Sequence, residues 1–141
     1  MIDALILAEG KYDTSDAKTA HGLVRKSMRY RVVGVIDSKY AGMDAGEVLD
    51  GRKRGIMIYR SLEEALRENP SVSVLIVGVA VAGGVLPLEY RATIREAMER
   101  GLSIVSGLHE FLSDDPELSK VSRERGVEII DVRKMYQGMK V

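Results

Sequence analysis

The sequence contains no cysteine and no tryptophan, and it has only one phenylalanine and three prolines among 141 residues. Without cysteine, disulfide bridges, thiolate metal sites and cysteine nucleophiles are excluded. Aromatic platforms for stacking bases are scarce, and Lys+Arg equals Asp+Glu at 21 each. A balanced charge with few aromatics argues against binding of nucleic acid.

Long hydrophobic runs are missing as well. No segment approaches the ~18 apolar residues that a membrane span requires. The first ten residues, "MIDALILAEG", contain Asp3 and only a short apolar run, which is unlike a secretory signal. We therefore expect a cytoplasmic protein that does not act at a membrane.

The familiar phosphate-binding motifs are also absent. A P-loop requires G-x-x-x-x-G-K-[ST], but "GKYDTSDAKT" has Ala17 in place of the second glycine, and Lys18-Thr19 lie two residues too far from Gly10. The G-x-G-x-x-G of dinucleotide-binding folds is missing too, which disfavours an ordinary NAD-dependent dehydrogenase. The two histidines give no zinc-ligand spacing, so we predict no metal site.

What the sequence does contain is a regular alternation of apolar runs and stretches of helical period. A capping box, Ser61 with Glu64, predicts the start of one helix, and Asp115-Pro116 predicts the start of another. Residues 38–55 hold four glycines and no clear period, so they are predicted to form a loop. The strands are predicted at residues 4–8, 31–37, 56–59, 73–80, 102–106 and 127–132.

This alternation predicts a single α/β domain over residues 1–141. Parallel strands need a crossover of about a dozen residues, which the predicted helices supply. Right-handed crossovers then give a doubly wound, mostly parallel six-stranded sheet, with strand order 3-2-1-4-5-6 as the leading hypothesis.

Small and polar residues gather where the predicted strands end. Ligands of doubly wound sheets bind beyond the carboxyl ends of the strands, and small residues there leave backbone N–H groups open to a phosphate or a carboxylate. We therefore predict a site for a nucleotide or another small anionic ligand, of a kind that the sequence does not identify. The candidate binding residues are Gly10, Lys18, Thr19, Asp37, Ser38, Gly78, Gly83, Gly84, Ser106 and Gly107.

Several of these residues have two interpretations. Asp37 either binds a ribose hydroxyl or caps a turn. Lys18 either binds an anion from the first turn of a helix or is an ordinary surface lysine. His109, after the fifth strand, is either a general acid/base or a packed loop residue. The basic turn "GRKRG" at residues 51–55 is too short for a polybasic patch.

The segment 38–55 raises a question of assembly. It contains the apolar side chains of Tyr40, Met43, Val48 and Leu49. These residues either pack on a second copy, which would make the protein a homo-oligomer, or fold back on their own sheet.

Six blocks of sequence carry a resemblance to a known family: "AKTAHGLVR", "VVGVIDSKYAGMDAGEVLDG", "SLEEAL", "LIVGVAVAGGVLPLEYR", "GLSIVSGLHEFLSDDPEL" and "DVRK". From residue 5 to about residue 134 the chain resembles the N-terminal Rossmann-like domain of a domain-of-unknown-function family. In that family the domain is usually followed by a P-loop NTPase domain, and some members are linked to D-amino-acid N-acetylation. The resemblance implies a Rossmann-like fold and a pocket built by the residues named above, with a P-loop NTPase as partner or further domain.

Three functions are compatible with these observations. The leading hypothesis is a ligand-binding module that works with a P-loop NTPase. The second is an enzyme, acyltransferase-type or NAD(P)-dependent, with its site at the carboxyl ends of the strands and with His109 and Lys18 as its working groups. The third is a structural, homo-oligomerising module.

Overall fold

The structure is a computed structural model that describes residues 1–25, 29–79, 86–108 and 111–132. Six strands form one sheet in the order β3-β2-β1-β4-β5-β6, and every neighbouring pair is parallel. This confirms the predicted doubly wound sheet and its strand order. The strands are β1 (Ile2–Leu7), β2 (Tyr30–Ile36), β3 (Met57–Tyr59), β4 (Val74–Val77), β5 (Ser103–Ser106) and β6 (Ile129–Asp131).

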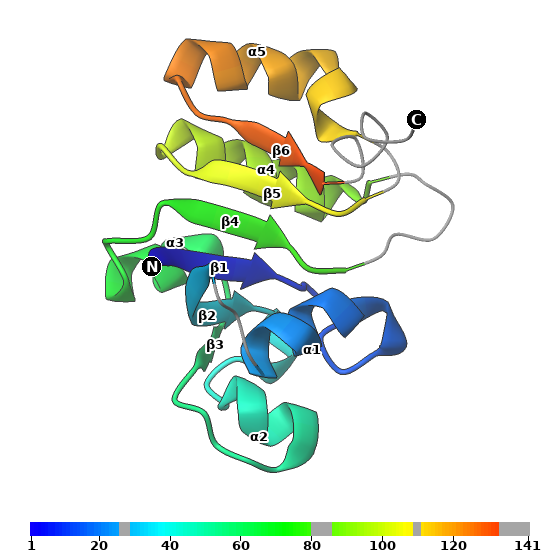
Figure 1. Cartoon of the computed structure of the whole chain (residues 1–141), viewed down its shortest axis with the longest axis vertical. Helices are drawn as coiled ribbons and strands as arrows, with labels where there is room; N and C mark the ends of the chain where they lie inside the picture. The colour runs from blue at the N-terminus through cyan, green and yellow to red at the C-terminus, as the bar shows by residue number, and fades with distance from the viewer. Residues whose placement is uncertain (26–28, 80–85, 109–110, 133–141) are drawn as a thin grey trace.

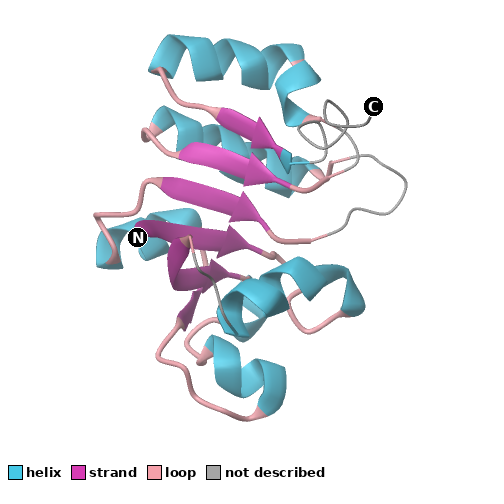
Figure 2. Ribbon diagram, viewed as in Figure 1, coloured by secondary structure: helices cyan, strands magenta, loops and turns pink. Residues whose placement is uncertain are grey.

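The described residues also form five α-helices that pack against the sheet: α1 (Lys18–Arg25), α2 (Ala45–Asp50), α3 (Leu62–Glu68), α4 (Leu88–Glu99) and α5 (Pro116–Arg125). Figure 1 shows α1 and α2 on the near face of the sheet, and α3 and α4 behind it. In Figure 2 no described helix lies in front of β4, β5 and β6. Among the described helices, none is long and apolar enough to cross a membrane.

The core lies between the sheet and the helices and is centred on β1 and β4. The side chains of Ala4 to Leu7 are buried, as are those of Val74 to Val77. A continuous apolar run is expected of a parallel strand that is covered on both faces. Helix α4 adds a stripe of four buried side chains, Tyr90, Ile94, Ala97 and Met98.

Helix α1 sits directly on the end of β4 because residue 78 has no side chain. The amide of Ala20 in α1 donates a hydrogen bond to the carbonyl oxygen of Gly78, at 3.2 Å. A Cβ at position 78 would lie 2.6 Å from Cγ2 of Ile6 and 3.0 Å from Cβ of Ala20. Gly78 is thus needed for the close approach of α1 to the sheet.

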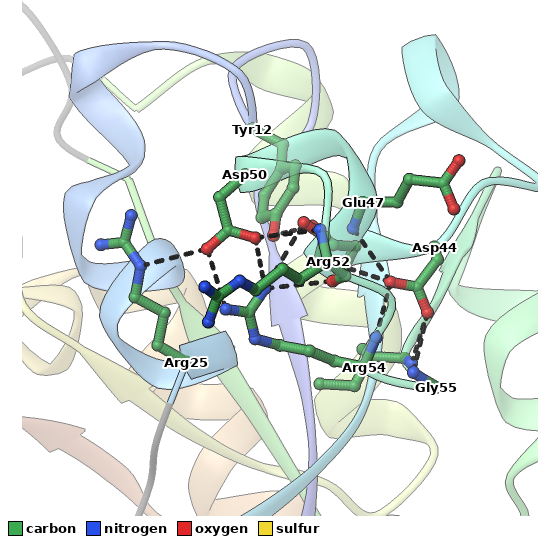
Figure 3. A network of polar contacts seen from close by, with 11 residues as sticks. Tyr12, Arg25, Asp44, Glu47, Asp50, Arg52, Arg54 and Gly55 are labelled. Atoms are coloured by element: carbon green, nitrogen blue, oxygen red, sulfur yellow. Dashed lines mark hydrogen bonds and ion pairs between the residues drawn. The ribbon is translucent and has the colours of Figure 1, made fainter.

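A helix lies within residues 38–55, so the predicted loop is wrong for part of this segment. Helix α2 has only six residues, begins after Asp44 and ends at Gly51, whose φ of 79° is left-handed. The two carboxylate oxygens of Asp44 accept backbone N–H groups from five residues, at 2.8 to 3.2 Å, as Figure 3 shows in part. The carboxylate of Asp44 therefore caps the N-terminus of α2 and also holds residues 54–56, which lead back to β3. The five donors are Gly46, Glu47, Arg54, Gly55 and Ile56.

Two glycine-to-alanine variants should separate packing from helix propensity. Gly78→Ala places a methyl group against Ile6 and Ala20, so we expect it to lower the free energy of unfolding by about 1–3 kcal/mol. Gly22 lies in α1, and a Cβ there meets no atom within 4 Å. Gly22→Ala is therefore expected to raise stability by about 0.5–1 kcal/mol. Denaturant unfolding measures both values, and equal effects of the two variants would contradict the close contact at Gly78.

The carboxylate of Asp44 should make stability depend on pH. Burial by itself raises the pKa of Asp44, but the hydrogen bonds from the amides of Arg54, Glu47, Gly55 and Gly46 outweigh it and lower that pKa. The stabilising effect is then complete above the ordinary carboxyl pKa of about 4 and is lost as the pH falls through the lower folded-state value. We expect Asp44→Asn to cost about 2 kcal/mol near neutral pH and less in acid.

Unfolding of the native chain and of Asp44→Asn at neutral and at acid pH checks this expectation. Glu68→Gln, at an exposed position of α3, is the matched control and should leave the free energy of unfolding unchanged at both pH values. A cost for Asp44→Asn that stays constant into strong acid would show that the ionised carboxylate is not responsible.

Candidate functional site

The turn after β1 is held by a buried carboxylate from the end of β2. Asp37 has no exposed surface. Its Oδ1 accepts the amides of Gly10 and Lys39, and its Oδ2 accepts the amide of Tyr12, each at 3.0 Å. In a dinucleotide-binding fold the turn after the first strand offers its amides to the pyrophosphate. Here a protein carboxylate accepts two of them, so Asp37 makes the contacts of a turn-capping residue.

Tyr12 anchors the same turn from its other side. Its side chain is fully buried, and its hydroxyl donates to the carbonyl oxygen of Ala45 at 2.7 Å. The ring of His21 meets the Tyr12 ring edge-on, with centroids 5.3 Å apart, and His21 Nε2 bonds to the Tyr12 carbonyl oxygen. Burial raises the pKa of Tyr12 to about 12, so the phenol keeps the proton that it donates. The turn is thereby fixed to α1 and α2 before any ligand arrives.

Glu9 and Ser38 form the second contact between the ends of β1 and β2. The Glu9 carboxylate accepts the Ser38 amide at 2.9 Å and the Ser38 hydroxyl. The Glu9 carbonyl oxygen accepts the hydroxyl of Tyr90 in α4, at 2.7 Å, and burial raises the pKa of Tyr90. Ser38 therefore lies at the predicted edge of the sheet, held by a neighbouring side chain.

Two of the predicted residues line one pocket on the near face of the sheet. This apolar pocket has a volume of about 440 Å³ and runs beside α1. Thr19 from α1 and Gly107 from the end of β5 line it at the carboxyl edge. Its wall is almost wholly apolar, and the lining residues are Thr19, Leu23, Tyr30, Ile76, Val77, Val105, Gly107 and Val132.

The remaining predicted residues have separate places. Lys18 is exposed on the first turn of α1, next to Thr19. Gly78 serves the packing of α1, as described above. Ser106 is fully buried, and its hydroxyl accepts the amide of Leu108 at 3.2 Å. Gly83, Gly84 and His109 lie outside the described residues. The edge thus brings Thr19 and Gly107 into one pocket, while Gly10 and Asp37 form a turn.

One buried acid was not predicted. Asp131 ends β6, is 4% exposed, and accepts the amides of Leu112 and Ser113 at 2.9 and 3.0 Å. Asp131 thus accepts backbone amides at the end of β6, as Asp37 does at the end of β2. The available signal was an aspartate that directly follows an apolar run, as in "VEIIDV".

The basic turn at residues 51–55 is largely used within the fold. Arg54 makes a two-pronged ion pair with Asp50, at 2.8 Å for both N–O distances, and also donates to the carbonyl oxygens of Gly46 and Arg52 (Figure 3). The hydrogen bond from Arg54 lowers the pKa of Asp50 to about 2. Of the apolar residues in segment 38–55, Tyr40, Val48 and Leu49 are partly buried against the core of their own domain, whereas Met43 is exposed. Over the described ranges, no group of three or more His, Asp or Glu side chains is arranged to hold a metal ion.

The fold and this edge define a class of protein. A six-stranded parallel sheet whose order reverses between β1 and β4, with pockets at its carboxyl ends, is a Rossmann-like α/β domain. The model of a family described as a domain of unknown function, the DUF1611_N Rossmann-like domain, matches residues 38–135, well over half of the chain. The chain belongs to this family, which confirms the resemblance seen in its sequence.

Known relatives agree with this assignment. A crystal structure of a DUF1611 family protein from Anabaena variabilis superposes with a TM-score of 0.83 at 33% identity, covering 94% of this chain and 37% of that one. A D-glutamate N-acetyltransferase from Tritonibacter scottomollicae is 37% identical over 73 residues, which are 52% of this chain and 21% of that protein. The chain thus spans well under half of the length of either relative.

A more distant neighbour shares the fold alone. A homoserine dehydrogenase from Thiobacillus denitrificans superposes with a TM-score of 0.60 at 17% identity, covering 92% of this chain and 29% of that one. At this identity the likeness is one of architecture, and it places the sheet of this chain among Rossmann-like domains.

Removing the buried carboxylate of Asp37 should loosen the turn after β1. We expect Asp37→Ala to lower the free energy of unfolding by about 3 kcal/mol, because it leaves the amides of Gly10, Tyr12 and Lys39 without their acceptor. Asp13 is the matched control: it is exposed and contacts Lys39 and Tyr40 at the surface, so Asp13→Ala should cost less than about 1 kcal/mol. Similar costs for both variants, measured by denaturant unfolding, would contradict the structural role of Asp37.

Proposed function

We propose that this domain binds a nucleotide or another small anionic metabolite at the carboxyl edge of its sheet, as the ligand-binding part of an acyltransferase-type enzyme. The observation that carries this proposal is the apolar pocket, because its lining includes Val77 at the end of β4 and Gly107 after β5, and Rossmann-like sheets bind their ligands at the carboxyl ends of their strands. Family membership and the acetyltransferase relative support the enzyme class.

The pocket favours a ligand with an apolar part and an anionic end. Ile76, Val77 and Val105 give it an apolar wall, while Thr19 offers a hydroxyl at the edge. Lys18 adds an exposed positive charge beside Thr19. An acyl-coenzyme A has both a long, weakly polar arm and several phosphates, so it is the first ligand to test.

A dinucleotide is the second candidate and has less support. The fold is that of Rossmann-like domains, but the carboxylate of Asp37 occupies the amides of Gly10 and Tyr12. A pyrophosphate at this turn would meet a negative charge in place of free N–H groups. The same contacts give a physical reason why this sequence lacks the glycine-rich motif.

The remaining machinery would come from a second component. The chain covers only 21% and 37% of the lengths of the acetyltransferase and the Anabaena relative. A P-loop NTPase, as partner or as further domain, is our candidate for that component. The domain described here would then contribute ligand binding, with His109 as an untested candidate for proton transfer.

Binding of acetyl-coenzyme A should be detectable and should depend on the edge of the apolar pocket. We expect acetyl-coenzyme A to raise the melting temperature of the chain, since a ligand that binds only the folded state stabilises it. Thr19→Asp introduces a negative charge where the anionic end is proposed to bind, and we expect it to weaken binding at least about tenfold. Calorimetric titration of both chains measures the change.

Two controls accompany this titration. Lys120→Ala removes an exposed lysine on α5 that does not line the apolar pocket, and it should leave the affinity unchanged. NAD and ATP are titrated in parallel to compare the candidate classes. If acetyl-coenzyme A, NAD and ATP all fail to bind, or if Thr19→Asp binds them like the native chain, the proposal is overturned.

A further inference from the structure

A second pocket lies on the opposite face of the sheet, between α3 and α4. We call it the charged pocket; its volume is about 310 Å³. Its floor is formed by Leu7, Ile36 and Leu62, which are 1–3% exposed. Glutamates and an arginine stand around this floor. The pocket touches the carboxyl ends of β1 and β2, so it shares the ligand-binding edge with the apolar pocket but opens on the other side.

Most of the charged groups around this pocket already have partners. The carboxylate of Glu9 holds Ser38, Glu63 pairs with Arg67 at 3.5 Å, and Glu96 pairs with Arg100 at 3.2 Å. The charges of Glu63 and Glu96 are therefore partly neutralised by arginines of this chain, whereas the carboxylate of Glu9 is held by neutral donors alone.

Two charged side chains at this pocket, those of Arg60 and Glu89, are not paired in this way within the described residues. Arg60 follows β3, Glu89 lies in the first turn of α4, and both are exposed at the pocket. Within the part of the chain that the structure describes, no hydrogen bond or ion pair engages the Arg60 guanidinium or the Glu89 carboxylate. The pocket thus presents one free positive and one free negative group on elements that face each other across an apolar floor.

We infer that the charged pocket is a binding site for a small zwitterion, of the class of the α-amino acids. A guanidinium binds a carboxylate through two parallel hydrogen bonds, so Arg60 would hold the carboxylate of the ligand. Glu89 would hold its ammonium group, and the apolar floor would take the side chain. The hydroxyl of Ser61 accepts the amide of Glu64 and can still donate its own proton to the ligand.

The charge balance makes the ammonium group essential. The carboxylate of Glu9 contacts only the neutral amide and hydroxyl of Ser38, so it leaves an excess of negative charge around the pocket, which attracts an ammonium group and disfavours a purely anionic molecule. An N-acylated amino acid has lost its positive charge and should bind poorly. The charged pocket is therefore distinct in ligand class from the apolar pocket, to which we assign an anionic ligand.

One link to the proposed function follows. If the domain belongs to an acyltransferase-type enzyme, an amino acid in the charged pocket would be its acyl acceptor, and that assignment rests on the proposed function. The binding of a zwitterion does not rest on the proposed function, because it depends on other residues and on the other face of the sheet.

Titration of the isotope-labelled chain with alanine, followed by NMR, tests the inference. We expect at least one enantiomer of alanine to shift the backbone amide signals of Ser61, Leu62 and Thr93. The expected affinity is weak, with a Kd in the millimolar range. N-acetylalanine should bind at least about fivefold more weakly, since it lacks the ammonium group. Arg60→Gln and Glu89→Gln should each weaken the binding of alanine to a similar extent.

Glu68→Gln is the matched control, because Glu68 is an exposed glutamate of α3 that does not line the pocket. It should bind alanine like the native chain. The inference is overturned if alanine leaves these signals unmoved, if N-acetylalanine binds as well as alanine, or if the Arg60 and Glu89 variants bind alanine as the control does. Loss of acetyl-coenzyme A binding in the Thr19 variant concerns the other pocket, so the two proposals fail separately.

Discussion

The arrangement of this domain depends on one kind of interaction, a hydrogen bond from a backbone amide to an aspartate carboxylate. Asp37 at the end of β2 holds the turn after β1, Asp44 holds the chain around α2, and Asp131 at the end of β6 holds the segment before α5. Hydrogen bonds to charged acceptors are stronger than those between neutral groups. They fix loops that contain few apolar side chains, and so they shape the edge where ligands of this fold bind.

Much of the fold could be predicted because burial leaves a strong pattern in the sequence. The runs around Leu5 and Leu75 are apolar throughout, as is typical of the central strands of a parallel sheet, and the capping box at Ser61 begins α3 as expected. Helix α2 could not be predicted in the same way. Its six residues are too few to show a period, and its stability comes from contacts of Asp44 with residues as distant as Ile56.

The sequence predicted which residues lie at the carboxyl ends of the strands better than it predicted their contacts. The carboxyl ends of the strands do carry Gly10, Ser38 and Gly107, and the edge does border two pockets. The sequence alone could not show that Asp37 turns inward, because whether a carboxylate meets a ligand or an amide depends on the path of a loop 25 residues away in sequence. Nor could it show that Arg60 and Glu89 face one pocket, since they come from separate elements.

The outer strands of the sheet have a consequence for assembly. β3 and β6 each have three residues, and Met57 of β3 also forms an isolated antiparallel bridge with Asp44. Short edge strands, and the bridge at β3, leave few free backbone groups with which a strand of another chain could pair. Many proteins limit edge-to-edge aggregation in this way. We therefore expect a partner of this domain to bind a side-chain surface in preference to the backbone edge at β3.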